Sequence, residues 1–292
     1  MHMTGHQMMT HPYQGRQVVL ATKHQKEQVL GPPLQSAVGL SLCLPDNLDT
    51  DLLGTFTGEV ERVGSPRETA IQKARWGMAV MDMSLGLASE GSFGPDPQIL
   101  FVPTSHELLA FVDDERGITV IEQIIDPETN YDHVAAHDLT TLEKFLTRVQ
   151  FPSHGLIVRP NSGLQPGLLF KGITDTASLQ DAVKTCSSSS EDGLAHVETD
   201  MRAHMNPTRR KVLKKVAQML GQRLATLCPQ CSTPGWGRVD LIKGLPCEWC
   251  GEKTLLTHTE VYGCVHCDYQ ENHPRHDGIR YASPAYCPSC NP

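Results

Sequence analysis

Short apolar runs separated by turn residues organise the first part of the chain. Residues 17–22 (QVVLAT) form a continuous apolar run of the kind found in a strand buried on both faces. A helix should follow and break near residues 31–33 (GPP), because proline removes a helix hydrogen bond. A second strand is expected over residues 41–44, and a glycine-containing loop over residues 48–64.

A helix start is well marked at Ser65. This serine stands at the cap, Pro66 at the first helical position, and Glu68 three residues past the cap completes a capping box. The helix should run to about Met83, with small and apolar residues at amphipathic spacing on its inner face. These are Ala70, Ile71, Ala74, Gly77, Met78 and Met81.

The middle of the chain alternates further strands with helices. Strands are expected at residues 85–88, 99–102, 108–112, 118–125, 156–158 and 168–171, with a hairpin turn at 113–117. Asp138 should cap a helix through about Val149, a short helix should cover residues 178–185, and the serine run 187–190 should belong to a flexible loop. The order predicts an α/β fold with a mixed central sheet flanked by helices.

Asn206 and Pro207 open the last helix of this part, with Asn206 as the cap. Its apolar stripe contains Val212, Val216, Leu220 and Leu224. Charge changes sharply here. Residues 1–200 hold 13 Lys and Arg against 26 Asp and Glu, residues 201–227 hold 7 against none, and residues 228–292 hold 5 against 7. A short basic segment therefore joins two acidic bodies.

Composition favours a chain in several parts. The 292 residues are 39% apolar and only 5% aromatic, which suits one medium domain and a small appendage. We predict a flexible N-terminal arm at residues 1–15, an α/β domain at 16–227 and a zinc domain at 228–292. No stretch approaches the roughly 18 apolar residues of a membrane span, and no secretory leader is visible, so we expect a soluble cytoplasmic protein without a membrane partner.

Eight of the ten cysteines fall in four Cys-x-x-Cys pairs near the C-terminus. Such pairs are typical zinc knuckles, because zinc binds four thiolates in a tetrahedron. Cys43 and Cys186 stand alone, and we interpret them as reduced, partly buried residues. We predict two structural zinc ions held by the eight paired cysteines. The pairs are Cys228 and Cys231, Cys247 and Cys250, Cys264 and Cys267, and Cys287 and Cys290.

The pairing of the knuckles has two solutions. Successive pairs are separated by 15, 13 and 19 residues, and hairpins of that length favour sequential pairing, first with second and third with fourth. The alternative is an interleaved arrangement, first with third and second with fourth. Residues 228–292 are acidic, and each zinc tetrathiolate adds a charge of −2, which disfavours binding of RNA phosphates. A protein partner, or the neighbouring domain, is therefore at least as suitable a ligand for this zinc ribbon as RNA.

Four motifs resemble the house-cleaning nucleotide pyrophosphatases of the inosine triphosphatase and Maf type. They are the Ala21-Thr22 strand end followed by a cationic turn, the helix segment from Glu68 to Ala74 (ETAIQKA), the segment from Leu87 to Gly91 (LASEG) after a strand, and Arg209-Arg210 at the last helix. Their order agrees over about residues 17–222. The stretch from Arg202 to Arg209, joined to paired zinc knuckles, also resembles an uncharacterised bacterial family known only as a domain of unknown function.

The pyrophosphatase resemblance implies an inosine triphosphatase-like fold and a magnesium-dependent hydrolysis of a nucleoside triphosphate, standard or not, to the monophosphate and pyrophosphate. It implies Glu68 and Glu90 as catalytic magnesium ligands with Lys73 on the phosphates. The implied substrate-binding residues are Thr22, Lys23, Lys26, Arg202, His204, Arg209 and Arg210. Three departures bear on this reading. Thr69 replaces the family's Asn in the helix, and the usual Asn of the first turn is absent, with Lys23 and His24 in its region. One carboxylate, Glu90, stands where the family has an acidic pair.

Ordinary structural roles compete with each assignment. The competing role of Glu68 is the capping box alone, and that of Lys73 and the turn lysines is a solvated surface charge. The competing role of the basic segment is to neutralise acidic neighbours. The alternative function is accordingly a non-catalytic zinc-ribbon adaptor that binds a nucleotide, RNA or protein partner. The sequence leaves the oligomeric state open.

Overall fold

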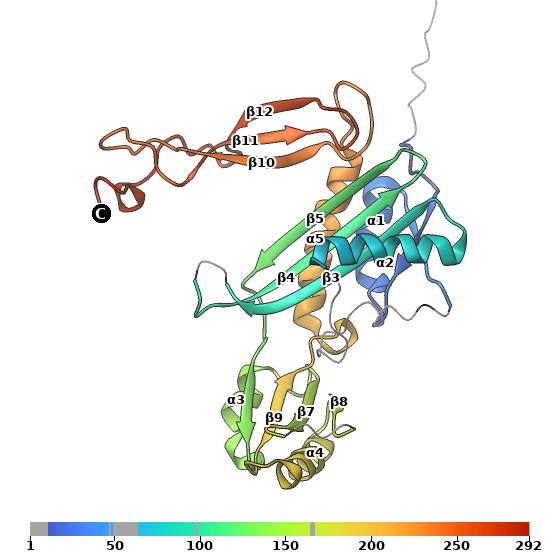
Figure 1. Ribbon diagram of the computed structural model, residues 1–292, viewed down its shortest axis with the longest axis vertical. Coiled ribbons are helices and arrows are strands. Elements are labelled where there is room, and N and C mark those ends of the chain that lie inside the picture. Colours follow the sequence, from blue (N-terminus) through green and yellow to red (C-terminus); the bar gives the residue numbers. More distant parts are fainter. Residues whose placement is uncertain (1–10, 47, 49–63, 97–98, 164–166, 292) are drawn as a thin grey trace, which may run out of the picture.

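A mixed five-stranded sheet forms the centre of the computed structural model, which describes residues 11–46, 48, 64–96, 99–163 and 167–291 (Figure 1). The strand order is β2-β1-β3-β4-β5. Strands β2, β1 and β3 are parallel, and β4 and β5 continue as antiparallel hairpins. The strands are β1 (Gln17–Ala21), β2 (Ser41–Cys43), β3 (Leu85–Pro95), β4 (Pro103–Asp113) and β5 (Ile118–Asp126). The predicted mixed α/β fold is confirmed.

Helices cover both faces of this main sheet. On one face, α1 (Glu27–Val38) and α5 (Pro207–Ala225) pack side by side, and their leucines share a core with Leu20 and Leu109. On the other face lies α2 (Pro66–Met81), whose Ala74 packs against β1 and β3. Its predicted capping box between Ser65 and Glu68 is present.

A second unit is inserted between β5 and α5 (Figure 1, bottom). It has an antiparallel four-stranded sheet of order β6-β9-β7-β8 and a hydrophobic core of its own. We call residues 127–206 the inserted unit. The strands are β6 (His133–Ala136), β7 (Leu156–Pro160), β8 (Phe170–Ile173) and β9 (Ala195–Thr199), and the helical elements are η2 (Leu139–Thr141), α3 (Glu143–Arg148), α4 (Thr176–Ser189) and η3 (Ala203–Met205). The segment predicted as one domain, 16–227, therefore contains two sheets with separate cores.

The C-terminal arm, residues 228–291, extends from the end of α5 (Figure 1). It is a three-stranded antiparallel sheet of β10 (Gly237–Lys243), β11 (Thr257–Gly263) and β12 (Gln270–Pro274), followed by η4 (Pro284–Tyr286). The far end of the arm, with the C-terminus, lies away from the main sheet in Figure 1.

Several predicted elements need correction. Helix α1 continues through Pro32 and Pro33, since burial of Leu30, Leu34 and Val38 in the main core outweighs the lost hydrogen bonds. Residues 99–102 form the turn of the β3–β4 hairpin and not a strand, because Pro95 pairs with Pro103 and the chain must reverse between them.

Two short strands, β6 and β9, were not predicted, and α4 is longer than predicted. Strand β9 does alternate buried and half-buried residues, but over only five positions. Ser187 to Ser189 finish α4 where a flexible loop was expected, and Ser187 is buried there. The predicted loop 48–64 lies almost wholly outside the described residues.

The described end of the predicted N-terminal arm is folded. Tyr13 is fully buried in the main core, and its hydroxyl donates to Asp113 Oδ2 over 2.9 Å. His11 lies 3.0 Å from the carbonyl oxygen of Leu224 at the end of α5. Aromatic burial thus fixes residues 11–15, whereas residues 1–10 lie outside the described part. Among the described residues, no helix combines the length and apolar composition that a membrane span requires.

Candidate functional site

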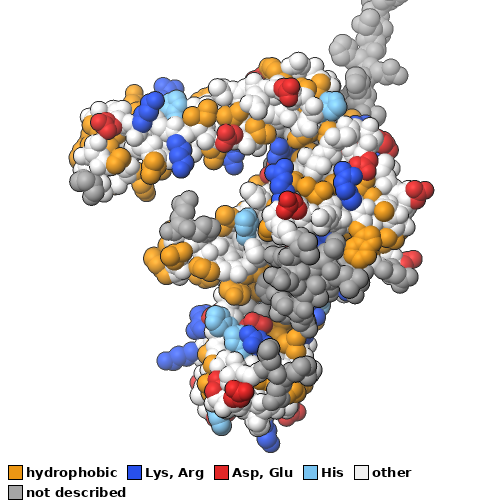
Figure 2. Space-filling view, in the orientation of Figure 1, with side chains coloured by type: hydrophobic (Ala, Val, Ile, Leu, Met, Phe, Trp, Pro, Cys, Tyr) orange, Lys and Arg blue, Asp and Glu red, His pale blue; other side chains and the backbone are white. Residues whose placement is uncertain are grey.

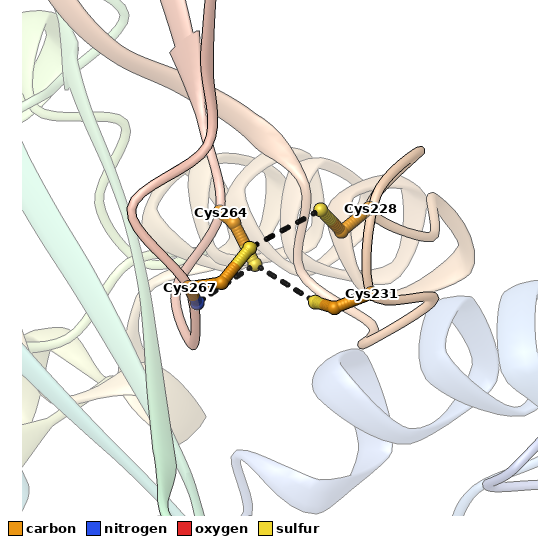
Figure 3. Close-up of side chains that lie close together, drawn as sticks. All are labelled: Cys228, Cys231, Cys264 and Cys267. Carbon is orange, nitrogen blue, oxygen red and sulfur yellow. Dashed lines mark hydrogen bonds between the residues drawn. The ribbon is translucent and has the colours of Figure 1, made fainter.

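The eight paired cysteines form two groups of four. The proximal cluster contains Cys228, Cys231, Cys264 and Cys267, and the distal cluster contains Cys247, Cys250, Cys287 and Cys290; within each, the sulfur atoms lie within 4.8 Å of one another. Closest approaches across the proximal cluster are 3.8 Å and 3.5 Å (Figure 3), and those across the distal cluster are 3.9 Å and 3.5 Å. A tetrahedral zinc with bonds of about 2.3 Å places its sulfurs about 3.8 Å apart, so each group fits one zinc ion.

The pairing is interleaved, and the preferred sequential pairing was wrong. The seven-residue strand β10 lies between the first and second knuckles and holds them apart by about 20 Å. Antiparallel pairing of Gly237 with Gly263 instead brings the first knuckle to the third. Strand β12 returns the chain, and Ala282 bonds to the Pro246 carbonyl, which brings the fourth knuckle to the second. His266, which lies between two cysteines of the proximal cluster in the sequence, is not a member of either group.

The proximal cluster is attached to the main sheet through the end of α5. Arg223 of α5 donates to the Gly235 carbonyl in the arm and to Ile121 O and Glu122 on β5. Val265, between two proximal cysteines, packs against the main core. The distal cluster carries exposed aromatic residues instead: Trp249 is 76% exposed, and Tyr281 and Tyr286 are 61% and 64% exposed.

Five charged residues form a second candidate site inside the fold, which we call the buried charge cluster: Lys26, Lys73, Glu90, Glu107 and Arg209. Lys73 Nζ donates to Glu90 Oε1 over 2.6 Å, and both side chains are buried. Arg209 donates to both oxygens of the fully buried Glu107, over 2.6 Å and 3.2 Å. Three cations face two carboxylates, so the five residues carry a net charge of +1.

Lys26 is the cation without a carboxylate of its own within this set. Its ammonium donates to Ser89 Oγ over 2.9 Å. Burial, and next the positive charge of Arg209, lower the pKa of Lys26 to about 8, although Glu107 and Glu90 oppose the shift. The protein interior here disfavours a further positive charge and would favour an incoming anion.

The end of β1 explains why these residues meet. Strand β1 stops at Ala21, opposite Ala88 of β3, so β1 does not extend along the following residues of β3. Alternation along β3 points Glu90 toward α2 and Ser89 toward α1 and α5. Groups from both faces therefore meet beyond the end of β1, beside the first turn of α1. Carboxyl ends of parallel strands are common ligand sites in open α/β sheets.

The environment of Arg209 is built from small and aromatic residues of β3. Gly91 lies opposite Glu107, and a Cβ there would come within 2.4 Å of an Arg209 nitrogen. The Arg209 guanidinium also lies 5.0 Å from the ring centre of Phe93 and donates to the Met201 carbonyl. A side chain at position 91 would therefore displace the Arg209 guanidinium or the Glu107 carboxylate from these positions.

Other predicted substrate residues gather where the first turn of α1 meets the first turn of α5. His204 stacks on His24 with ring centres 5.1 Å apart, and Arg210 donates to Gln28 over 3.1 Å. Thr22 and Lys23 precede His24 in the same turn, where Thr22 Oγ1 donates to the Lys23 carbonyl. Arg202 is held by buried Asp200 over 2.6 Å.

Glu68 lies apart from the buried cluster. It is exposed, and its carboxylate accepts hydrogen bonds from the backbone and the hydroxyl of Ser65, both at 2.8 Å, which lowers its pKa. Glu68 and Lys73 are five positions apart, about 140° around the helix axis. Lys73 faces the sheet, so Glu68 points elsewhere. The structure places Glu68 in its capping role and does not bring it to Lys73 and Glu90.

Sequence reasoning missed Glu107 and Phe93. A carboxylate directly before the apolar run 108–112 of a strand was a usable signal, because a charge in that position must be paired if it is buried. Its partner lies 102 positions away in the chain, and no local pattern identifies it.

The family of the chain follows from a match over most of its length. The family described as "Domain of unknown function (DUF6671)" matches residues 73–292, and the chain belongs to this family. That region contains both cysteine clusters and four residues of the buried charge cluster. No curated protein and no solved structure matches the chain. The resemblance to inosine triphosphatase and Maf pyrophosphatases is not confirmed by these comparisons.

Proposed function

We propose that the buried charge cluster binds the phosphate groups of a nucleotide and that the protein hydrolyses a nucleoside triphosphate to the monophosphate and pyrophosphate. The observation that carries the proposal is the excess of one positive charge among five residues brought from β3, β4, α2, α5 and the start of α1. An excess charge in a largely buried position is stabilised by a bound anion, and phosphate is an anion that both lysine and arginine bind well.

Each side chain has a role in this proposal. Lys26 and Lys73 would donate to phosphate oxygens, and the positive charge of the site would stabilise the charge that develops on the leaving pyrophosphate. Arg209 would add a planar donor, held in place by Glu107 and Phe93. When phosphate takes the Lys73 ammonium, the Glu90 carboxylate would be released from its ion pair.

Glu90 is then the carboxylate suited to magnesium. Hard oxygen ligands are what this ion prefers, and it usually binds through one or two carboxylates together with the substrate phosphates. Bound there, magnesium would supply positive charge to the phosphate oxygens. Glu68 does not fit this task, because its carboxylate is already used at the helix cap.

A screen of nucleoside triphosphates for magnesium-dependent pyrophosphate release tests the proposal. Lys73→Met and Glu90→Gln should each lower turnover by at least about 100-fold, as expected when a transition-state charge partner is lost. Lys144→Met, at an exposed position on α3, is the matched control and should leave turnover unchanged. Turnover that survives both cluster substitutions would refute the assignment.

The second candidate function is an adaptor in which the cluster holds its ligand without turnover and the arm recruits a protein. The exposed Trp249, Tyr281 and Tyr286 beside the distal cluster favour it, since aromatic side chains are enriched at protein interfaces. Binding of a nucleotide without pyrophosphate release from any triphosphate would support this function over hydrolysis.

A further inference from the structure

A row of aromatic side chains leads from the buried charge cluster into the inserted unit. Phe93, beneath the Arg209 guanidinium, lies 6.1 Å from Tyr131, and Tyr131 lies 6.5 Å from His133. His133 then stacks on His196 of β9 with ring centres 5.3 Å apart and planes inclined by 24°. We call Phe93, Tyr131, His133 and His196 the ring row. None of the four is fully buried.

Cations accompany the ring row at both ends. At the first end lie Arg209 and the buried charge cluster, whose net charge is positive. At the second end, the exposed Arg159 of β7 is the cross-strand neighbour of His196. Figure 2 shows His, Lys and Arg side chains gathered on the part of the inserted unit nearest the main sheet. Two acids also face the row: Asp132, bound to Arg148 over 2.6 Å, and Glu198, 3.4 Å from His196.

A cavity of about 460 Å³ opens beside the middle of the ring row. It lies between the tip of the β3–β4 hairpin, including Phe101, and the segment that carries Tyr131 and His133. Arg148 also lines it, and Phe101 is 88% exposed. The cavity therefore combines the rings of Phe101, Tyr131 and His133 with polar groups, a lining suited to a planar heterocycle.

We propose that the ring row and this cavity bind single-stranded nucleic acid, with consecutive bases stacking between Phe93 and His196. A single nucleobase covers one or two rings. The ring row has four rings in succession, so the ligand that matches its length is a chain of several nucleotides. Single strands bind proteins by stacking bases on aromatic side chains while cations contact the phosphates. The proposal rests on the proposed function only for the terminal phosphate, which the charge cluster would hold.

Fluorescence anisotropy on the full chain tests this inference. The probes are labelled 12-nucleotide RNA and DNA single strands of one sequence, the corresponding duplex, and a labelled nucleoside triphosphate. Single strands should bind more tightly than the duplex and the mononucleotide, with an affinity that falls as salt rises. The RNA and DNA strands decide which sugar the site prefers.

Substitutions in the ring row provide the sharper measurement. Tyr131→Ala and His196→Ala should each weaken single-strand binding by between about five-fold and about a hundred-fold, the range measured for lost base stacking. Tyr131→Phe keeps the ring and should retain binding. Tyr262→Ala is the matched control, because Tyr262 is also half-buried and contacts a histidine ring, His273, but lies in the C-terminal arm.

The outcomes separate the two proposals. Single-strand binding that depends on Tyr131 supports the ring row as a binding site. If the same protein neither binds nor hydrolyses a triphosphate, only the proposed function fails. A single strand that binds no more tightly than the mononucleotide or the duplex overturns the inference. Equal affinities of Tyr131→Ala, Tyr131→Phe and the unaltered protein overturn it as well.

Discussion

The main sheet and the C-terminal arm are stabilised in opposite ways. The main sheet buries large apolar side chains from four of its strands and from three helices, and its charged site sits at the edge of that core. Among the described residues, no hydrophobic core cluster lies within the arm, and only Val265 of the arm packs against the main core. We therefore expect the arm to obtain most of its folding free energy from metal bound at the two cysteine clusters.

This difference in stabilisation determines which side chains each region can bury and which it can expose. In the main sheet, ion pairing offsets the desolvation of the buried carboxylates, as Lys73 does for Glu90. In the arm, apolar and aromatic side chains such as Trp249 stay exposed, since the cysteine clusters and not a core fix the backbone. The region with a large apolar core thus contains a buried charged site, and the region with the cysteine clusters presents exposed aromatic side chains.

Removal of zinc should have the largest effect. Structural zinc contributes on the order of 10 kcal/mol to folding of small domains. We expect two zinc ions per chain by metal analysis, and chelation should unfold the arm while the main sheet stays folded. Limited proteolysis after chelation is the measurement, and cleavage should begin within residues 228–291.

A single zinc per chain, or first cleavage within residues 64–126, would contradict this comparison. Cys43→Ser, outside both clusters, is the control and should leave the zinc content at two. Cys231→Ser removes one thiolate from the proximal cluster, and Cys250→Ser removes one from the distal cluster. Each should lower the zinc content by one.

Breaking the buried ion pair of Arg209 should have the next largest effect. Glu107→Gln leaves a buried guanidinium without its charge partner, which typically costs about 3–5 kcal/mol. Urea denaturation measures the loss. The exposed pair of Arg75 and Asp114 provides the control, and Asp114→Asn should cost at most about 1 kcal/mol.

A double variant tests whether the cost comes from the unpaired charge. Glu107→Leu combined with Arg209→Met removes both charges and should recover most of the stability lost in Glu107→Gln. The same double variant should lose phosphate binding. Stability that stays low in the double variant would show that packing around Gly91, and not charge pairing, dominates.

Phosphate binding should weaken as pH rises through about 8. The pKa of Lys26 is lowered to about 8, so its ammonium is present below that pH and is lost above it. Binding of a nucleoside triphosphate at pH 7 and pH 9 measures the change, and Lys26→Met should remove the pH dependence. A pH dependence in the variant as steep as that of the unaltered protein, or steeper, would contradict the role of Lys26.

The sign for stability is opposite, which gives an internal control. Between pH 8 and the ordinary pKa of 10.5, the unfolded chain binds a proton on Lys26 that the folded chain does not. The contribution of Lys26 to the free energy of unfolding therefore increases with pH in that window. A loss of binding at pH 9 without a loss of stability is the expected combination.

The smallest effect is expected from Glu68→Gln. Glutamine can keep the reciprocal hydrogen bond to the Ser65 backbone, so the capping box survives with a slightly weaker acceptor. Turnover and thermal stability should both stay close to those of the unaltered protein. A large loss of magnesium-dependent turnover would return Glu68 to the catalytic role that the resemblance to pyrophosphatases implied.

Local patterns in the sequence determined many of the elements of this protein. Apolar runs predicted β1 and β5, the capping box at Ser65 predicted α2, and Asn206 with Pro207 predicted the start of α5. Spacing identified all eight cysteines that form the two clusters. These features depend on residues close together in the chain, so their physical causes are visible in the order of residues.

Tertiary structure alone decided which of these parts meet. The length of β10 imposed the interleaved cysteine pairing, core burial carried α1 through Pro32 and Pro33, and the return of α5 brought Arg209 to Glu107 across 102 positions. The ring row likewise joins β3 to the inserted unit. Such contacts depend on strand register and on the packing of whole elements, which are set by the sum of many burial and pairing energies and not by any one segment.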